Sequence, residues 1–140
     1  MSADHIPTTL RRLVYERAGG CCEYCLLPDA VTMAPLEVDH IIARKHGGEV
    51  EEQNLALCCA RCNKHKGSDL ATLDLETGEL VLLYHPRRNR WHDHFQVSGS
   101  LIIAVTAIGH ATVRLLQLNH PKRMAVRQTL VAVGLWPPAV

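Results

Sequence analysis

Two pairs of cysteines with metal-ligand spacing lie in the first half of this 140-residue chain. The pairs are Cys22-Glu-Tyr-Cys25 and Cys59-Ala-Arg-Cys62, and 33 residues separate one pair from the other. Four thiolates in two such pairs are the soft ligands that a tetrahedral structural zinc ion requires. The sequence therefore predicts one zinc ion that holds together the two ends of a long inserted segment.

Two further cysteines leave the choice of ligands open by one residue, because Cys21 and Cys58 directly precede the two pairs. Each is either an alternative ligand through Cys-x-x-x-Cys or an ordinary buried thiol. The two-residue spacing forms the tighter chelate loop, and it favours the ligand set Cys22, Cys25, Cys59 and Cys62. Cysteines in metal-type pairs suit a reducing compartment better than a disulfide framework does, so we expect a cytoplasmic protein.

A second group of residues with chemical potential lies between the cysteine pairs and just after them. Asp39 offers a hard oxygen ligand next to His40, whose imidazole accepts a proton near neutral pH. Asn63 directly follows the second pair and offers a further ligand, while His65 is an alternative that a solvent-facing helix position explains better. A purely structural zinc motif needs no Asp-His pair in its insertion. The sequence therefore indicates that chemistry takes place beside the zinc site.

Charge is distributed unevenly along the chain, although the net charge is only +1. Residues 1–79 carry 8 Lys/Arg and 13 Asp/Glu, whereas residues 80–140 carry 7 and 1. The basic second half is either a phosphate-binding surface or an ordinary basic exterior on helices, with Arg123 and Arg127 as examples of both explanations. The longest apolar run, residues 101–108, is too short to span a bilayer, and the first residues lack the apolar stretch of a signal peptide.

The elements expected around the cysteine pairs predict an α+β fold. We expect a helix from residue 8 or 9 to about residue 18, capped by Thr8 or Thr9, and ended by two glycines. A short strand over 36–41 and a glycine loop at 46–48 follow, and a helix runs from the second cysteine pair to residue 66.

The second half predicts a hairpin over 73–84, an apolar strand over 101–108, and helices over about 111–118 and 121–133. Trp91 and Phe95 are expected to anchor this half to the rest of the chain. We predict two parts, a core over residues 1–79 and a basic α/β extension over residues 80–140 that packs on it.

This ordered set of residues resembles the HNH endonucleases, in particular the group whose ββα-metal core is stapled by four cysteines. The resembling segments are Cys22-x-x-Cys25, Val38-Asp39-His40-Ile41, Gly47-Gly48, Asn54-Leu55 and Cys59-x-x-Cys62-Asn63-x-x-Lys66-Gly67. Flanking segments are also similar to bacterial members, among them Ile6-Pro7-x-x-Leu10-Arg11, Asp74-x-Glu76-Thr77-Gly78-Glu79-Leu80 and Trp91-x-Asp93-His94-Phe95. The resemblance implies a ββα-metal core with a four-cysteine zinc site, followed by a β-hairpin and a two-helix extension.

The resemblance also implies roles for individual residues. His40 matches the general base that takes a proton from the attacking water, and Asp39 matches the carboxylate that binds the catalytic divalent ion. Asn54 matches the middle asparagine that braces the loop and orients the histidine. Asn63 stands where many members have histidine, and its carbonyl oxygen is a harder ligand that favours Mg²⁺ or Mn²⁺ over zinc.

Elementary chemistry supports this assignment, because phosphodiester hydrolysis needs an activated water and a cation near the scissile phosphate. The residues expected to hold the nucleic-acid backbone are the nearby cations Arg44, Lys45, Lys64 and Lys66. The sequence thus predicts a metal-dependent endonuclease that cleaves DNA. By resemblance to the family, the products carry 5′-phosphate and 3′-hydroxyl ends.

Two other interpretations use the same residues. One is a non-catalytic, zinc-stapled nucleic-acid-binding module, although such a module has no use for Asp39, His40 and Asn63 together. The other is a component of a defence, toxin or phage-packaging system that acts with a partner protein. A homodimer through the terminal helices is a further possibility, since it would place two nicking centres on one DNA.

Overall fold

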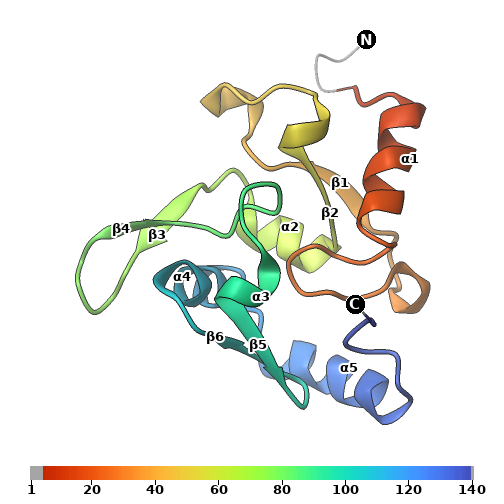
Figure 1. Ribbon diagram of the computed structural model, residues 1–140, viewed down its shortest axis with the longest axis vertical. Helices are drawn as coiled ribbons and strands as arrows, with labels where there is room; N and C mark the ends of the chain where they lie inside the picture. The colour runs from red at the N-terminus through yellow and green to blue at the C-terminus, as the bar shows by residue number, and fades with distance from the viewer. Residues whose placement is uncertain (1–4, 140) are drawn as a thin grey trace.

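The computed structural model describes residues 5–139, and within them three two-stranded antiparallel sheets are surrounded by five α-helices (Figure 1). The first half contains α1 (Thr8–Arg17), β1 (Glu37–His40), β2 (Leu55–Cys58), α2 (Ala60–Lys66), β3 (Ala71–Leu73) and β4 (Leu80–Leu82). The second half contains α3 (Trp91–His94), β5 (Phe95–Ser98), β6 (Leu101–Ala104), α4 (Ala107–Leu115) and α5 (Pro121–Ala132). The predicted α+β class is confirmed. No helix in the described part is both long enough and apolar enough to cross a bilayer.

The unit formed by β1, β2 and α2 is the predicted ββα core. β1 pairs with β2 in antiparallel register, which places His40 opposite Leu55. Only Cys59 separates β2 from α2, so the end of this hairpin leads directly into the helix. Val14 of α1 packs against Leu55 and Leu57 of β2 and closes a small core on the outer side of the hairpin.

The first helix begins differently from the expectation. Its N-cap is Pro7, whose carbonyl oxygen accepts the N–H groups of Leu10 and Arg11, and no side chain caps it. Thr8 and Thr9 both lie inside the first turn, where a hydroxyl cannot take the N-cap position, so the predicted threonine cap was wrong. The predicted end was right, because Gly19 adopts a φ of 63° directly after the helix.

In the second half, the apolar run over residues 101–108 is not one strand. β6 ends at Ala104, and Thr106 then starts α4 by accepting a hydrogen bond from the N–H of Gly109 at 3.0 Å. A side-chain cap in the middle of an apolar run therefore converts strand into helix. The partner of β6 is β5, a strand that the sequence reasoning missed although Phe95-Gln-Val-Ser98 alternates between more buried and exposed positions.

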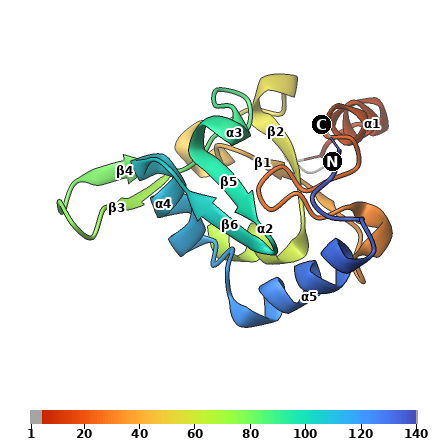
Figure 2. The ribbon, with the colours of Figure 1, turned by 60° about the horizontal axis from the view of Figure 1, so that its bottom comes forward.

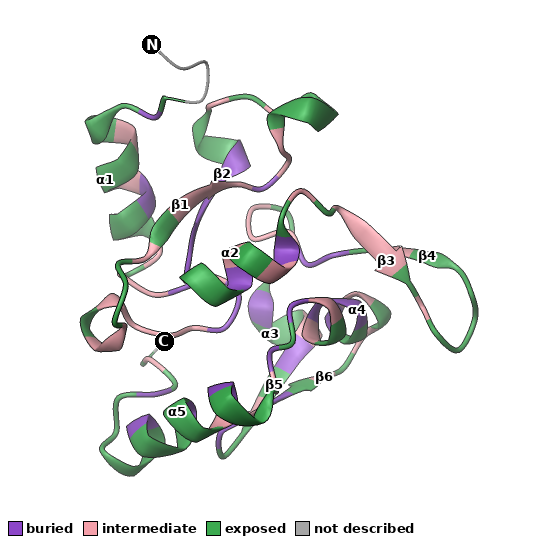
Figure 3. Ribbon diagram, turned by 180° about the vertical axis from the view of Figure 1, so that it is seen from behind, coloured by how far each residue is buried: buried purple, intermediate pink, exposed green. Residues whose placement is uncertain are grey.

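The largest core cluster joins the two halves of the chain. It contains the four cysteines of the two pairs together with side chains from the extension, among them Tyr84, Trp91, Phe95, Ile102, Leu116, Leu118 and Trp136. The buried side of α5 faces the rest of the chain, as Figure 3 shows. Residue 79 lies in the loop between β3 and β4, so the predicted boundary at 79/80 divides a hairpin.

Candidate metal centre and active site

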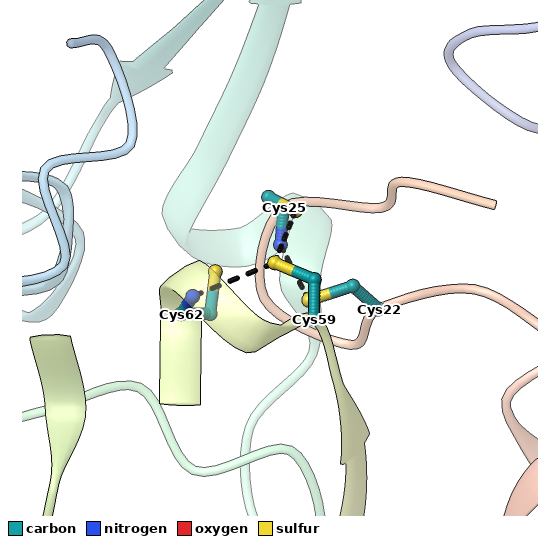
Figure 4. A group of neighbouring side chains, drawn as sticks. All are labelled: Cys22, Cys25, Cys59 and Cys62. Atoms are coloured by element: carbon teal, nitrogen blue, oxygen red, sulfur yellow. Dashed lines mark hydrogen bonds between the residues drawn. The ribbon is translucent and has the colours of Figure 1, made fainter. Parts of the chain in front are cut away.

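The four cysteines of the two predicted pairs meet at one point (Figure 4). Their Sγ atoms all lie within 4.8 Å of one another, and the Sγ atoms of Cys25 and Cys59 are 3.7 Å apart. A tetrahedron with Zn–S distances of about 2.3 Å has S–S edges of about 3.8 Å. All four side chains are buried. The cluster therefore fits a structural zinc ion in size, ligand type and burial.

Backbone N–H groups already point at two of these sulfur atoms. The N–H of Cys25 donates to Cys22 Sγ at 3.5 Å, and the N–H of Cys62 donates to Cys59 Sγ at 3.4 Å. Cys59 is also the N-cap of α2, so its sulfur lies at the positive end of the helix dipole. Both features favour the charged thiolate form that a zinc ligand needs.

Cys21 and Cys58 lie outside the group of four sulfur atoms that could hold one metal ion. Cys58 is fully buried in β2, where burial raises the pKa of its thiol and keeps it neutral. Cys21 is only half-buried, and its Sγ lies 3.6 Å from the carbonyl oxygen of Gly19. The tighter chelate spacing thus selected the four cysteines that cluster.

Asp39 and His40 end β1 with polar atoms that are buried and unsatisfied. Asp39 Oδ2 and His40 Nε2 are shielded from solvent, and neither has a hydrogen-bond partner of good geometry within residues 5–139. Such atoms are uncommon in native proteins and indicate a place that receives water, an ion or a ligand. A carboxylate oxygen and an imidazole nitrogen are groups that suit a hydrated divalent ion and an activated water.

Lys66 is the cation beside these atoms. Its Nζ lies 3.4 Å from Asp39 Oδ2 and 3.4 Å from the carbonyl oxygen of His40. The two side chains are largely buried, with 3% of Lys66 and 13% of Asp39 exposed. Burial raises the pKa of Asp39, and the positive charge of Lys66 opposes that rise.

Asn54 holds the loop behind His40 with three side-chain hydrogen bonds. Its Oδ1 accepts the N–H of Ile42, and its Nδ2 donates to the carbonyl oxygens of Ile42 and Glu49, each at 2.9 Å. Gly48 lies against the same place, because a Cβ there would collide with the Ile42 carbonyl oxygen. The two residues therefore fix the chain that leaves His40.

Comparison with known proteins bears directly on this arrangement. Residues 22–69 match the family model of the HNH endonucleases. The match covers about a third of the chain, and we refer to this segment below as the HNH domain. The matched range contains both cysteine pairs, Asp39, His40, Asn54 and Asn63, and it leaves the extension outside. No curated protein and no solved structure gives a significant match to the chain.

The last helix of the HNH domain, α2, carries the remaining predicted residues. Asn63, which is partly buried, lies three residues before Lys66 and so shares a helix face with it. Burial lowers the pKa of His65, and the charges of Arg123 and Lys64 lower it further.

The four predicted phosphate contacts have different environments in the HNH domain. Arg44 and Lys45 are exposed on a 3₁₀ turn over Arg44–His46, and Lys64 is exposed on α2. Lys66 is turned inward to Asp39 instead. Three of the four side chains are therefore placed where a nucleic-acid backbone can reach them.

Sequence reasoning missed the part that the extension plays at the cysteine cluster. Arg123 and Arg127 are buried, so neither explanation offered for them, a DNA-facing surface or a solvated helix face, was right. The indole N–H of Trp136 donates to the carbonyl oxygen of Cys25 at 3.1 Å, and that of Trp91 donates to the carbonyl oxygen of Tyr24 at 2.9 Å. Trp91 was predicted to anchor the extension, but no local pattern pointed to Arg123 or Trp136 as contacts of the cysteine cluster.

Proposed function

We propose that the protein is a metal-dependent endonuclease that hydrolyses DNA phosphodiester bonds through one catalytic centre at the end of β1. The observation that carries the proposal lies inside the HNH domain: His40 Nε2 is buried without a hydrogen bond among the described residues, and buried Asp39 Oδ2 has only the ion pair with Lys66 at 3.4 Å. A binding module that never performed chemistry gains nothing from burying two such atoms without hydrogen bonds, since each costs stability.

His40 acts as the general base in this proposal and removes a proton from the attacking water through Nε2. Asn54 keeps the imidazole in place by bonding to the backbone two residues after it, at Ile42. A divalent ion held by Asp39 and Asn63, Mg²⁺ or Mn²⁺, supplies positive charge to the scissile phosphate and the leaving 3′ oxygen when bound. Zinc stays at the cysteine cluster, where soft ligands select it.

The nucleic acid is expected to approach across α2 and the loop after β1. Lys64, Arg44 and Lys45 are exposed there and would bind the phosphates on either side of the cleaved bond. The positive charge of Lys66 favours the charged form of the buried Asp39 carboxylate, which is the form that binds a cation. The cysteine ligands need a reducing environment, which favours the cytoplasm.

Plasmid nicking tests the proposal most directly. Wild type and His40→Ala are compared in Mg²⁺, Mn²⁺ and EDTA, with His92→Ala as the matched control because His92 is exposed and lies outside the HNH domain. We expect metal-dependent cleavage by wild type and by the control, and a loss of roughly 100-fold or more in His40→Ala.

Zinc content and circular dichroism show whether each variant is folded. Cleavage that persists in folded His40→Ala would show that another group is the base. If folded, zinc-loaded wild type binds DNA but never cleaves it, the non-catalytic binding module replaces the nuclease.

A further inference from the structure

The strongest contact between the extension and the cysteine cluster is made by one arginine. Arg123 lies in the first turn of α5, and only 6% of it is exposed. Its Nη2 donates to Cys62 Sγ at 2.9 Å and lies 3.7 Å from Cys59 Sγ. The guanidinium therefore faces two of the four sulfur atoms that fit a zinc ion.

The other terminal nitrogen of the same guanidinium binds the end of the preceding helix. Nη1 of Arg123 donates to the carbonyl oxygens of Leu116 at 2.8 Å and Gln117 at 3.5 Å. Leu116 is the C-cap of α4, so the planar guanidinium of Arg123 connects the end of α4, the start of α5 and the cysteine cluster. Figure 2 shows α5 running along one side of the molecule.

Charge explains why an arginine is suited to this position. Four thiolates around one Zn²⁺ leave a net charge of about −2, and this charge is buried here. The guanidinium brings a positive charge and N–H donors to the two sulfur atoms, and such charge-assisted hydrogen bonds are the strong ones. Burial lowers the pKa of Arg123, but the thiolates outweigh that effect and hold the guanidinium in its charged form.

We propose that Arg123 is a positioning residue of the zinc centre and that it couples zinc retention to the docking of α5. Coupling between two binding events is reciprocal. Docked α5 keeps two thiolates hydrogen-bonded and so slows the release of zinc. Bound zinc in turn holds the Cys59 and Cys62 thiolates where Arg123 finds its partners. This coupling does not depend on the nuclease proposal.

Arg123→Met tests the proposal, because methionine fills part of the same volume without donors or charge. Zinc-loaded protein is mixed with an excess of a chromogenic chelator, and the rate of zinc release is recorded. We expect release roughly 10- to 100-fold faster than in wild type, because removing an outer partner of a metal ligand lowers metal affinity by about that factor. A rate equal to that of wild type would overturn the proposal.

A second measurement, the cobalt spectrum, reports on the sulfur atoms themselves. In Co²⁺-substituted protein, Arg123→Met should shift the sulfur-to-cobalt charge-transfer bands, since it removes hydrogen bonds to two thiolates. Arg127→Met is the matched variant, because Arg127 is also buried, one turn later, but donates to Ser100 and Asn119 instead of sulfur. It should leave the bands unchanged and speed zinc release less than Arg123→Met does. A shift of the same size in both variants would contradict the assignment.

Two further variants separate coupling from general loss of stability. Val14→Ala weakens the other core cluster, which contains no residue of the extension, and should leave both zinc release and the cobalt spectrum as in wild type. If Arg123→Met does not fold, Arg123→Lys is the alternative, because it keeps the charge but loses the planar set of N–H donors. It should release zinc faster than wild type, by a smaller factor than expected for Arg123→Met. Wild type that binds neither Zn²⁺ nor Co²⁺ would remove the zinc centre and this proposal together.

Discussion

The two polar sites of this HNH domain differ in how completely their polar atoms are satisfied. At the cysteine cluster, backbone N–H groups and Arg123 already reach Cys22, Cys59 and Cys62, and the surroundings are apolar side chains from both halves of the chain. At the end of β1, Asp39 Oδ2 and His40 Nε2 are buried without hydrogen bonds among the described residues. We call the cysteine cluster the permanent site, because it is suited to keep one ion. We call the end of β1 the open site, because its atoms are suited to ligands that exchange.

The two sites also differ in which part of the chain supports them. Asp39 and His40 are held by the ββα unit itself, through Asn54 and Lys66. The cysteine cluster is held largely from outside, by Arg123, Trp91 and Trp136 of the extension. Arg87 of the extension also pairs with Glu23, which lies between Cys22 and Cys25. The Glu23 carboxylate in turn accepts the N–H of Leu57. Substitutions in the extension should therefore affect the metal centre more than they affect the active site.

The largest effect on stability should come from removing a cysteine ligand of the permanent site. Cys62→Ala takes away one sulfur and the main partner of Arg123, so we expect loss of zinc and of cooperative unfolding. Zinc content and urea unfolding measure both. Cys21→Ser is the control and should retain zinc, because Cys21 lies outside the cluster. A folded, zinc-loaded Cys62→Ala protein would show that the cluster does not hold the fold.

Asn54→Ala removes the side chain that supports the open site and leaves the zinc ligands unchanged. It leaves the N–H and the carbonyl oxygen of Ile42 and the carbonyl oxygen of Glu49 without their partner, and we expect a loss of about 2–4 kcal/mol in the free energy of unfolding. Zinc content should stay at the wild-type level. Gln53→Ala, at the exposed neighbouring position, should change stability by less than about 0.5 kcal/mol. Loss of zinc in Asn54→Ala would mean that the two sites are not independently supported.

Lys66→Met tests whether the open site binds a divalent cation. The change leaves the largely buried carboxylate of Asp39 without its positive partner, and we expect a loss of about 1–3 kcal/mol of stability in EDTA. A divalent ion that binds Asp39 should recover part of this loss, so the same unfolding experiment is repeated in Mg²⁺. Exposed Lys64→Met is the control and should show no such recovery. Equal stability of Lys66→Met in EDTA and in Mg²⁺ would argue against a divalent ion at Asp39.

The smallest effect on stability should come from the exposed cations, which concern only the ligand of the open site. Lys45→Ala and Lys64→Ala are expected to unfold as wild type does, within about 0.5 kcal/mol. If each lysine contacts a phosphate, each change should lower the salt dependence of DNA binding by about one counterion. Affinity measured over a range of salt concentrations gives this slope. Slopes equal to that of wild type would place the DNA elsewhere.

Much of the core could be predicted because its determinants are local in the sequence. The Cys-x-x-Cys spacing selected the four clustered cysteines, and double glycine ended α1 where expected. Asn54 and Gly48 were also found from the pattern, although only the structure shows that they meet at Ile42. The prediction of one strand over 101–108 was wrong because a single residue, Thr106, caps α4 inside that apolar segment.

The sequence by itself determined which residues offer metal ligands and a proton acceptor, because such chemistry depends on side-chain type and on short spacings. It could not determine that Arg123 reaches Cys62, which lies 61 residues earlier in the chain. A basic residue on an amphipathic helix has the same local pattern whether it faces solvent or a buried thiolate. Only the tertiary packing of α5 against the cysteine cluster decided this, since burial of a cation is favourable only where the fold supplies an anionic partner.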